Sequence, residues 1–408
     1  MIKGKDAKPH IGIFGRRNNG KSSIINVLAN QDVAIVSDVA GTTTDPVKKS
    51  MEIPGIGPVI FIDTAGIDDS GELGLKRIEK SMQALKTVDA AILVITNNAF
   101  GPEERKLVTE LNNYEIPYVI LHNKSDIESL SSSFKHQVEF ETGAPVIEFS
   151  AVNVIQPEIL IATLRNILPE SAYQSKSLVG DLLKQGDTVL LITPIDIEAP
   201  EGRLILPQIQ VIRDILDNDC VAIVSKEREI DSLLKRLSPR PALAITDSQV
   251  FLKADASVPK DIPLTSFSII LARHKGDFQN YLKGTPYLGK LKDGDRLLIL
   301  ESCTHHVSCD DIGRVKIPRW VSNFSGKRLE FDVVAGLNKL PRDIHEYAMV
   351  IQCGGCMITR RQIINRLKPA VDAGIPVTNY GMAIAWVHGI YERAVAPFAK
   401  VSVSADYL

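Results

Sequence analysis

The sequence predicts an α/β protein of three domains, on three observations. The chain has 408 residues, which is too many for one ordinary hydrophobic core. Short apolar runs alternate with amphipathic stretches along most of its length, which is the rhythm of βαβ units around a mostly parallel sheet. Two stretches without apolar periodicity, at 171–177 and 255–263, interrupt that rhythm. We therefore expect domains at 8–170, 178–256 and 264–408.

The first expected domain begins with a strand that leads directly into a helix. We expect strands at 11–14, 59–63, 91–95, 118–122 and 146–149, and helices at 21–29, 73–85, 102–112 and 156–168. The segment 54–58 is rich in Pro and Gly and reads as a turn between two strands. One antiparallel hairpin should therefore extend this sheet.

The other two domains repeat the alternation of strands and helices. In the second we expect strands at 188–192, 221–225 and 242–246 with helices at 206–216 and 227–237, and we identify no catalytic motif there. In the third we expect strands at 267–271, 296–300, 329–333, 349–352 and 376–379 with helices at 277–283, 311–322, 359–373 and 381–387.

The composition excludes several classes of protein. Hydrophobic residues make up 44% and charged residues 24%, which is unlike disordered or coiled-coil chains. The net charge of -2 gives no bulk attraction to nucleic acid or to anionic lipid, and no apolar run approaches the ~18 residues of a spanning helix. The first residues are polar, and the five cysteines suit a reducing compartment. We expect a cytoplasmic protein without nucleic-acid or membrane partners.

A phosphate-binding loop opens the first domain, with the sequence Gly15-Arg-Arg-Asn-Asn-Gly-Lys-Ser22. It follows a strand and begins a helix, so its backbone N–H groups can cradle phosphate oxygens. The Lys21 ammonium would bind the β- and γ-phosphates and the Ser22 hydroxyl would bind Mg²⁺. The residues of this loop expected to contact the nucleotide are Gly15, Asn18, Asn19, Gly20, Lys21, Ser22 and Ser23.

Three further motifs follow in the order that a GTP site requires. In Asp63-Thr-Ala-Gly66, the carboxylate can reach Mg²⁺ and the Gly66 N–H can sense the γ-phosphate. In Asn123-Lys124-Ser125-Asp126, the Asp126 carboxylate can accept from the two N–H donors of guanine, which adenine lacks. Ser150-Ala151 can offer a backbone N–H to the guanine carbonyl. These motifs predict binding of GTP and GDP in preference to ATP.

The segment Val39-Ala-Gly-Thr-Thr-Thr-Asp45 resembles switch I of the GTPases related to the tRNA-modification GTPase and Era, which read Ala-Gly-Thr-Thr-Arg-Asp. The resemblance implies that Thr43 binds Mg²⁺ and senses the γ-phosphate, and it makes Lys21, Thr43, Asp63 and Gly66 the expected catalytic residues. Thr44 stands where the relatives carry Arg. Asn18 matches the Asn that holds K⁺ in potassium-dependent members, although it could simply shape the loop. Ile67 replaces the Gln that orients water in Ras-like proteins, so hydrolysis should be slow.

Cysteines near the carboxyl end of the chain suggest a metal site. Cys303 follows the expected strand 296–300, and Cys353 and Cys356 follow the strand 349–352. If both strands are parallel in one sheet, the three thiols meet at its carboxyl edge. Three cysteines with a variable fourth ligand suit a 4Fe-4S cluster. A structural zinc site that adds Cys309, or a redox-active CxxC pair, remains an alternative. The fifth cysteine, Cys220, reads as a small buried apolar residue.

The whole arrangement resembles the FeFe-hydrogenase maturation GTPases, whose cluster domain reads Cys-x-His, some fifty residues, then His-Cys-x-x-Cys. Cys303, His305, Cys353 and Cys356 match, and Gln352 replaces the family His. The resemblance implies a 4Fe-4S cluster with His305 as one candidate for its fourth ligand, besides His306, Asp310, a water or a partner group.

The same resemblance implies a biological role. Such proteins form homodimers through the middle domain, carry the two-iron precursor of the hydrogenase active site, receive it through radical-SAM maturases and deliver it to apo FeFe-hydrogenase. GTP hydrolysis would regulate the exchange of partners. The alternative is a regulatory GTPase with a structural zinc or redox cysteine domain, and iron and sulfide analysis would separate the two.

Overall fold

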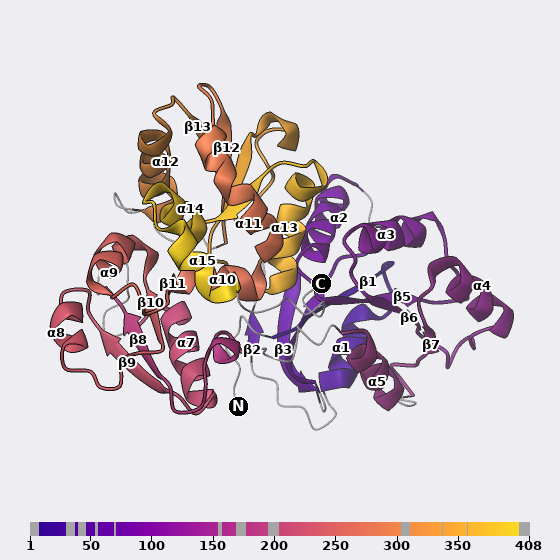
Figure 1. Cartoon of the computed structure of the whole chain (residues 1–408). Coiled ribbons are helices and arrows are strands. Elements are labelled where there is room, and N and C mark those ends of the chain that lie inside the picture. Colours follow the sequence, from indigo (N-terminus) through magenta and orange to yellow (C-terminus); the bar gives the residue numbers. More distant parts are fainter. Residues whose placement is uncertain are drawn as a thin grey trace. The chain divides into compact units, whose positions relative to one another are not determined.

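The computed structural model (Figure 1) divides into two compact units, residues 1–175 with 359–365 and residues 176–358 with 366–408. The residues that the structure describes are 8–29, 37–39, 46–53, 56–68, 71–153, 157–168, 177–194, 204–302, 311–336, 338–356 and 358–399. The first unit is built on one sheet and the second on two, so the predicted α/β class with three sheet-centred domains is confirmed.

The sheet of the first unit has seven strands in the order β2-β3-β4-β1-β5-β6-β7. Their bounds are β1 (His10–Gly15), β2 (Ser37–Val39), β3 (Val47–Ile53), β4 (Gly57–Asp63), β5 (Ala90–Ile95), β6 (Tyr118–His122) and β7 (Val146–Glu148). The pairs β2–β3 and β3–β4 are antiparallel, and the others are parallel. The expected hairpin is therefore present as β3 and β4.

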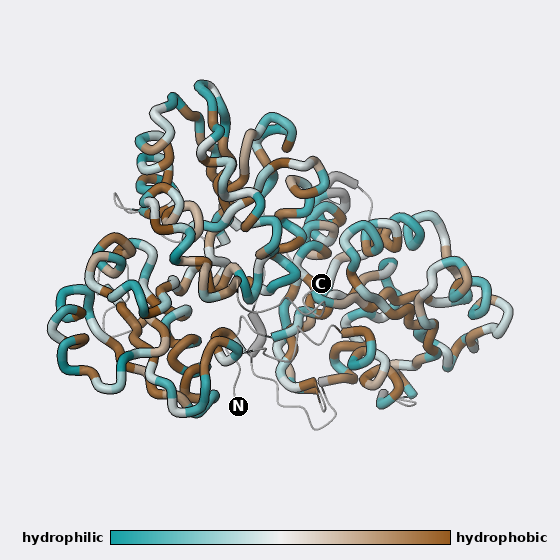
Figure 2. Tube along the Cα trace, in the orientation of Figure 1, coloured by the Kyte–Doolittle hydropathy of each residue, from teal (hydrophilic) through white to brown (hydrophobic). Residues whose placement is uncertain are grey.

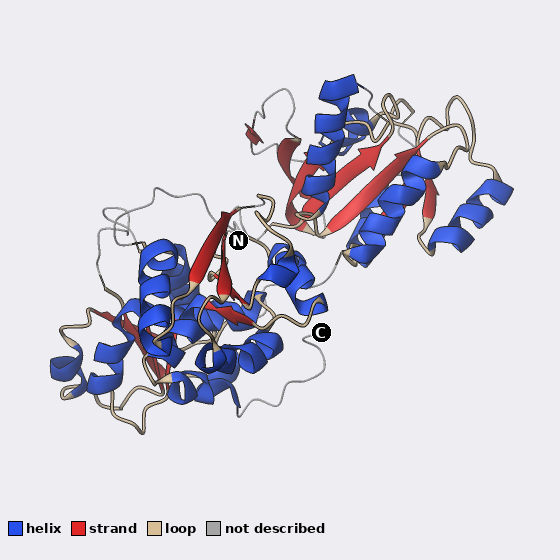
Figure 3. Cartoon of the chain, turned by 90° about the horizontal axis from the view of Figure 1, so that it is seen from above, coloured by secondary structure: helices blue, strands red, loops and turns tan. Residues whose placement is uncertain are grey.

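Helices cover both faces of this sheet (Figure 3). Apolar residues of α1 (Lys21–Ala29) and α5 (Pro157–Ile167) share a core cluster with one face. Residues of α2 (Gly71–Leu85), α3 (Pro102–Asn113) and α4 (Ser132–Thr142) share a cluster with the other. Because the interior strand β5 is covered on both faces, all six of its residues, Ala-Ala-Ile-Leu-Val-Ile, are buried and apolar. Figure 2 shows these inner strands as the most hydrophobic part of the unit.

The second unit contains two four-stranded parallel sheets. The middle sheet has the order β11-β10-β8-β9, and the carboxyl-terminal sheet has the order β13-β12-β14-β15. The strands are β8 (Thr188–Ile192), β9 (Val221–Ser225), β10 (Leu243–Thr246), β11 (Leu264–Ser266), β12 (Arg296–Glu301), β13 (Glu330–Ala335), β14 (Met349–Gln352) and β15 (Val377–Asn379).

Helices connect these strands. The α-helices are α7 (Leu206–Asp217), α8 (Ile230–Leu234), α9 (Phe251–Ser257), α10 (Phe267–Lys275), α11 (Phe278–Gly284), α12 (Ile317–Ser325), α13 (Arg360–Asp372), α14 (Tyr380–Val387) and α15 (Tyr391–Ala399). Short helices of other types are η2 (Gly180–Leu182), η3 (Ser248–Val250), η4 (Thr285–Lys290), η5 (Ile312–Lys316) and η6 (Ile344–Glu346). In the part of the chain described, no helix is both long and apolar enough to cross a membrane.

One expected strand is wrong: the segment 267–271 is the start of helix α10. Ser266 caps this helix, because its hydroxyl accepts a hydrogen bond from the Ile269 N–H at 3.3 Å. The segment is apolar because it is buried, and a short buried run has no periodicity that separates a helix from a strand. The strand lies just before it as β11, which pairs with β10. The middle sheet therefore extends to Ser266, past residue 256 where the sequence placed the end of that domain.

Candidate nucleotide site and cysteine site

Two glycines shape the phosphate loop between β1 and α1. Gly15 ends β1 with a φ of +145°, and a Cβ added there would lie 2.3 Å from the Val94 carbonyl oxygen. Gly20 has a φ of +87°, and its Cβ would lie 2.4 Å from the amide nitrogen of Asn123. Both positions combine a left-handed backbone with close packing, so only glycine fits them.

The loop gathers three of the predicted polar groups at the carboxyl ends of β1 and β4. The buried Lys21 ammonium donates to the carbonyl oxygens of Gly15 at 3.0 Å and Arg16 at 2.9 Å. The Ser22 hydroxyl donates to the Asp63 carboxylate at 2.5 Å. Asp63 ends β4, which pairs with β1 in register. The neighbouring Ser23 is exposed on α1.

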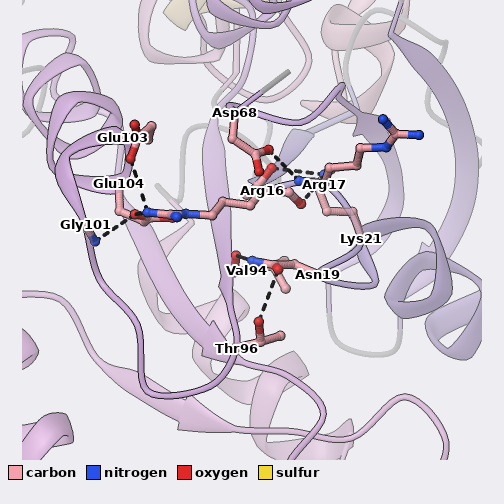
Figure 4. Close-up of polar contacts among 11 residues, drawn as sticks. Arg16, Arg17, Asn19, Lys21, Asp68, Val94, Thr96, Gly101, Glu103 and Glu104 are labelled. Atoms are coloured by element: carbon pink, nitrogen blue, oxygen red, sulfur yellow. Dashed lines mark hydrogen bonds and ion pairs between the residues drawn. The ribbon is translucent and has the colours of Figure 1, made fainter. Parts of the chain in front are cut away.

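The predicted base-recognition segments converge on the same loop. The Asn123 side chain donates to the Asn19 carbonyl oxygen at 2.8 Å and accepts from the Ala151 N–H at 3.2 Å. The fully buried Ser150 donates its hydroxyl to the exposed Asp126 carboxylate. Lys124 has a φ of +63°, which turns the chain after β6. The Asn19 side chain is itself fixed, since it donates to the Val94 carbonyl at 2.9 Å and accepts from Thr96 at 3.1 Å (Figure 4).

An ion pair that the sequence did not suggest ties the loop to helix α3 (Figure 4). Arg16 donates to the two carboxylate oxygens of Glu104 at 2.6 and 2.8 Å, and to Glu103 at 3.1 Å. The Glu104 side chain is 1% exposed and also accepts from the Gly101 N–H at 2.8 Å. Burial works to raise the pKa of Glu104, but the bonds from Arg16 and Gly101 outweigh it and the pKa is lowered. The two residues lie 88 positions apart in the sequence, so no local sequence pattern predicts this ion pair.

The segment after Gly66 also contacts the loop. The Asp68 carboxylate accepts from the Arg17 N–H at 2.6 Å (Figure 4). The Ile67 N–H donates to the Gly15 carbonyl at 3.2 Å. Asn18 is exposed with a φ of +63°, a left-handed conformation that Asn tolerates better than most residues. Thr43, the expected Mg²⁺ ligand of switch I, lies outside the described residues.

In the second unit, the CxxC motif begins at the carboxyl end of β14. Strand β14 pairs with β12 in parallel, and the Cys353 N–H donates to the Leu300 carbonyl at 2.9 Å. Ser302 follows β12 and faces the cysteine: its N–H donates to the Cys353 sulfur at 3.1 Å, and its hydroxyl oxygen lies 2.9 Å from that sulfur. The residue just before Cys303 therefore touches Cys353. Cys303, His305 and Cys309 themselves lie outside the described residues.

Gln352 is a fully buried neighbour of the Cys353 sulfur. Its amide nitrogen lies 3.4 Å from that sulfur and 3.2 Å from the Ser302 hydroxyl oxygen. Its carbonyl oxygen has no hydrogen-bond donor among the described residues. The side chain therefore presents an N–H donor to the thiol, which is the role of a hydrogen-bonding neighbour and not of a metal ligand.

Lys275, at the end of α10, holds the second half of the CxxC loop. Its ammonium donates to the carbonyl oxygens of Gly355 at 3.4 Å, Cys356 at 3.2 Å and Ile358 at 3.1 Å. Cys353 and Cys356 are partly exposed, whereas Cys220 is buried. Within the described ranges, no three His, Cys, Asp or Glu side chains form a group that could hold a metal ion.

Comparison with known families gives three matches along the chain. "50S ribosome-binding GTPase" matches residues 10–124, "Hydrogen maturase F dimerization domain" matches 178–276, and "Hydrogen maturase F tetramerization domain" matches 279–397. The last two together cover more than half of the chain.

Curated relatives match the first unit. The GTPase Der of Wolinella succinogenes is 36% identical over 152 residues, which are 35% of this chain and 32% of that protein. The tRNA modification GTPase MnmE of Nitrosomonas europaea is 35% identical over 173 residues, which are 40% of this chain and 37% of that protein. The chain thus spans about a third of the length of these relatives.

Solved structures that resemble the chain include Era and the G domain of FeoB. Era of Aquifex aeolicus bound to GDP.AlF4- has 20% identity and a TM-score of 0.34, covering 53% of this chain and 92% of that one. The G domain of the T. maritima FeoB iron transporter has 17% identity and a TM-score of 0.32, covering 40% of this chain and 99% of that one.

Proposed function

The chain belongs to the hydrogen maturase F family and carries a GTPase domain, and we propose that it is a GTP-hydrolysing scaffold for hydrogenase maturation that binds a 4Fe-4S cluster. In this proposal it holds the two-iron precursor of the FeFe-hydrogenase active site, receives it through radical-SAM maturases and delivers it to apo-hydrogenase. The observation that carries the proposal is the cysteine motif at the carboxyl edge of a parallel sheet, on the same chain as a GTP site.

The residues around Cys353 fit a bound cluster. A thiolate that binds iron is commonly stabilised by N–H and O–H donors, and Ser302 and Gln352 place such donors at the Cys353 sulfur. Cys303, Cys353 and Cys356 would supply three thiolates. Because the Gln352 amide faces a sulfur, the fourth ligand comes from elsewhere, and His305 is our candidate. The cluster would supply a redox-active centre with one iron open to exchange.

The GTP site would work through the groups already assembled at β1 and β4. On nucleotide binding, the Lys21 ammonium exchanges its two carbonyl partners for the β- and γ-phosphates, and the Ser22 hydroxyl exchanges Asp63 for Mg²⁺. Thr43 completes the Mg²⁺ site and the Gly66 N–H senses the γ-phosphate. The Asp126 carboxylate gives up its hydrogen bond from the Ser150 hydroxyl and accepts hydrogen bonds from the guanine N–H donors. A K⁺ ion held by Asn18 would supply the positive charge that an arginine finger supplies in other GTPases.

The homodimer would form through strand β9, at the edge of the middle sheet. An edge strand offers unpaired N–H and C=O groups to a second copy. Val221 and Val224 on β9 are 51% and 44% exposed, and Leu216 at the end of α7 is 55% exposed. Replacing Val224 with Lys should convert the dimer to monomer in light scattering. The same change at Ile127, an exposed residue of the first unit, is the control.

Anaerobic reconstitution of single Cys→Ser variants tests the central proposal. Loss of Cys303, Cys353 or Cys356 should reduce bound iron and sulfide and abolish the EPR signal of the reduced cluster, whereas Cys309→Ser should leave all three unchanged. Full iron occupancy without Cys353 would contradict the assignment. Zinc in place of iron, bound with the help of Cys309, would favour a regulatory GTPase with a structural zinc domain.

A further inference from the structure

Arg366 on helix α13 reaches the carboxyl ends of two strands beside the cysteine motif. Its guanidinium donates to the Glu301 carbonyl oxygen at 2.8 Å and to the Val334 carbonyl oxygen at 3.1 Å. Glu301 ends β12, and Val334 is the last but one residue of β13. The cation is thus fixed by main-chain oxygens at the sheet edge that also carries Cys353.

This partly buried cation has no carboxylate partner among the described residues. The Glu301 carboxylate, although close in sequence to one of its contacts, pairs with Arg314 at 2.8 Å. Burial lowers the pKa of Arg366, because it withdraws the guanidinium from water. A charge withdrawn from water at such a cost normally has an anion beside it. The Glu301 carbonyl that Arg366 binds and the Ser302 N–H that donates to the Cys353 sulfur at 3.1 Å belong to one peptide group, so the Cys353 site is where such an anion would bind.

We propose that Arg366 is the counter-charge of an anionic iron–sulfur cluster bound at Cys353, and that it raises the reduction potential of that cluster. The inference rests on the proposed function, because it requires the cluster to be present. One-electron reduction by an external reductant adds one negative charge to the cluster and makes or breaks no bond. A fixed positive charge in a poorly solvated site favours the more negative state, so it favours the reduced cluster.

The test compares the charge of Arg366 with its hydrogen bonds. Arg366→Gln and Arg366→Met remove the charge, whereas Arg366→Lys keeps it but cannot reproduce the two-pronged contact. Arg328→Gln is the matched control, since it removes the same charge from an exposed position that precedes β13, at the opposite edge of the sheet. Each full-length protein is reconstituted anaerobically, its iron and sulfide are counted, and its midpoint potential is measured by redox titration followed by EPR.

The two neutral variants should bind a cluster whose midpoint potential is shifted to a more negative value, while the Lys variant and Arg328→Gln stay close to wild type. A neutral variant at the wild-type potential overturns the inference. A midpoint potential of Arg366→Lys that is shifted as far as that of Arg366→Gln overturns it too, because the hydrogen bonds of Arg366 and not its charge would then set the potential. If the wild-type protein itself takes up no iron and sulfide, the proposed function falls as well, so the two failures are distinguishable.

Discussion

Removing the Arg16 side chain should destabilise the first unit and weaken nucleotide binding. Breaking a buried ion pair costs about 3 to 5 kcal/mol when the remaining charge stays buried. Glu104, whose side chain is 1% exposed, would be such a charge after Arg16 is removed. Arg16 is 36% exposed and Glu104 keeps its bond from Gly101, so solvent and that bond recover part of the cost. We therefore expect Arg16→Ala to lower the free energy of unfolding by about 2 kcal/mol.

Arg105 offers a matched control within the same helix. It pairs with Glu141 through two similar bonds, at 2.5 and 3.1 Å, but both partners are substantially exposed. Arg105→Ala should therefore destabilise the first unit much less than Arg16→Ala does. Both tryptophans, Trp320 and Trp386, lie in the second unit, so their fluorescence does not report on the first. Hydrogen exchange of β1 and α3 amides gives the local free energies, and fluorescent GDP gives the affinity.

A double-mutant cycle separates the pair from its surroundings. Glu104→Gln keeps the volume and the acceptor for the Gly101 N–H but removes the charge, and combining it with Arg16→Ala isolates the coupling. We expect a coupling energy of about 1 to 2 kcal/mol and a GDP affinity that falls with Arg16→Ala. If Arg16→Ala costs no more than Arg105→Ala, or if the coupling is close to zero, the burial of Glu104 does not govern the strength of this contact.

Four other outcomes are expected. Asp126→Asn should shift nucleotide preference from GTP toward xanthosine triphosphate, and equal binding of ATP and GTP by wild type would refute the base assignment. Hydrolysis should be faster in K⁺ than in Na⁺ at equal ionic strength, and Asn18→Ala should remove the difference. Lys275→Met should speed loss of iron to a chelator relative to Lys275→Arg, because three loop carbonyls lose their donor. Burial raises the pKa of Asp89 from 3.8 to about 6. The free energy of unfolding of the first unit therefore falls as the pH rises from the lower of these values through the higher, because ionising the buried carboxyl is unfavourable. Asp89→Asn should therefore stabilise the first unit at pH 7 by up to about 3 kcal/mol and have no such effect below pH 4, as measured by hydrogen exchange of β5 amides.

The sequence predicts which motifs come together at the phosphate loop, because each of these motifs follows the end of a strand. In a parallel sheet the carboxyl ends of strands meet at one edge, so Gly15, Asp63 and Asn123 come together once β1, β4 and β6 are recognised. The contact of Asn123 with the Asn19 carbonyl is a direct result of that geometry. Local patterns are sufficient here, because each motif marks its own strand end.

Contacts that depend on packing between distant elements could not be predicted. Arg16 and Glu104 are unremarkable surface types in sequence, and only the placement of α3 beside the loop joins them. Gln352 is a second residue whose contacts could not be predicted. The sequence identifies it as a departure from the family His, but only the structure shows its amide directed at the Cys353 sulfur. Helices α4, α9 and α15 were also missed, and α8 is shorter than the expected 227–237.

The two sheets of the second unit have the same topology, which explains where the cysteines are. In each, the first strand is internal, the second lies on one side of it, and the third and fourth lie on the other. Each sheet therefore has a point at which the strand order changes sides, between β8 and β10 in the middle sheet and between β12 and β14 in the carboxyl-terminal sheet. Open α/β sheets bind ligands at such switch points. Cys353 follows β14 at this point, and Ser302 follows β12.

The equivalent position of the middle sheet carries different chemistry. Thr193 follows β8, and Asp247 follows β10 and caps η3 by accepting from the Gln249 N–H at 2.9 Å. The two sheets thus have carboxyl edges of the same geometry. They differ in the residues that follow the strands, which include cysteines at the carboxyl-terminal sheet but not at the middle sheet. The fold alone would have predicted two ligand sites, whereas the residues favour the carboxyl-terminal sheet as the place of the proposed soft-metal site.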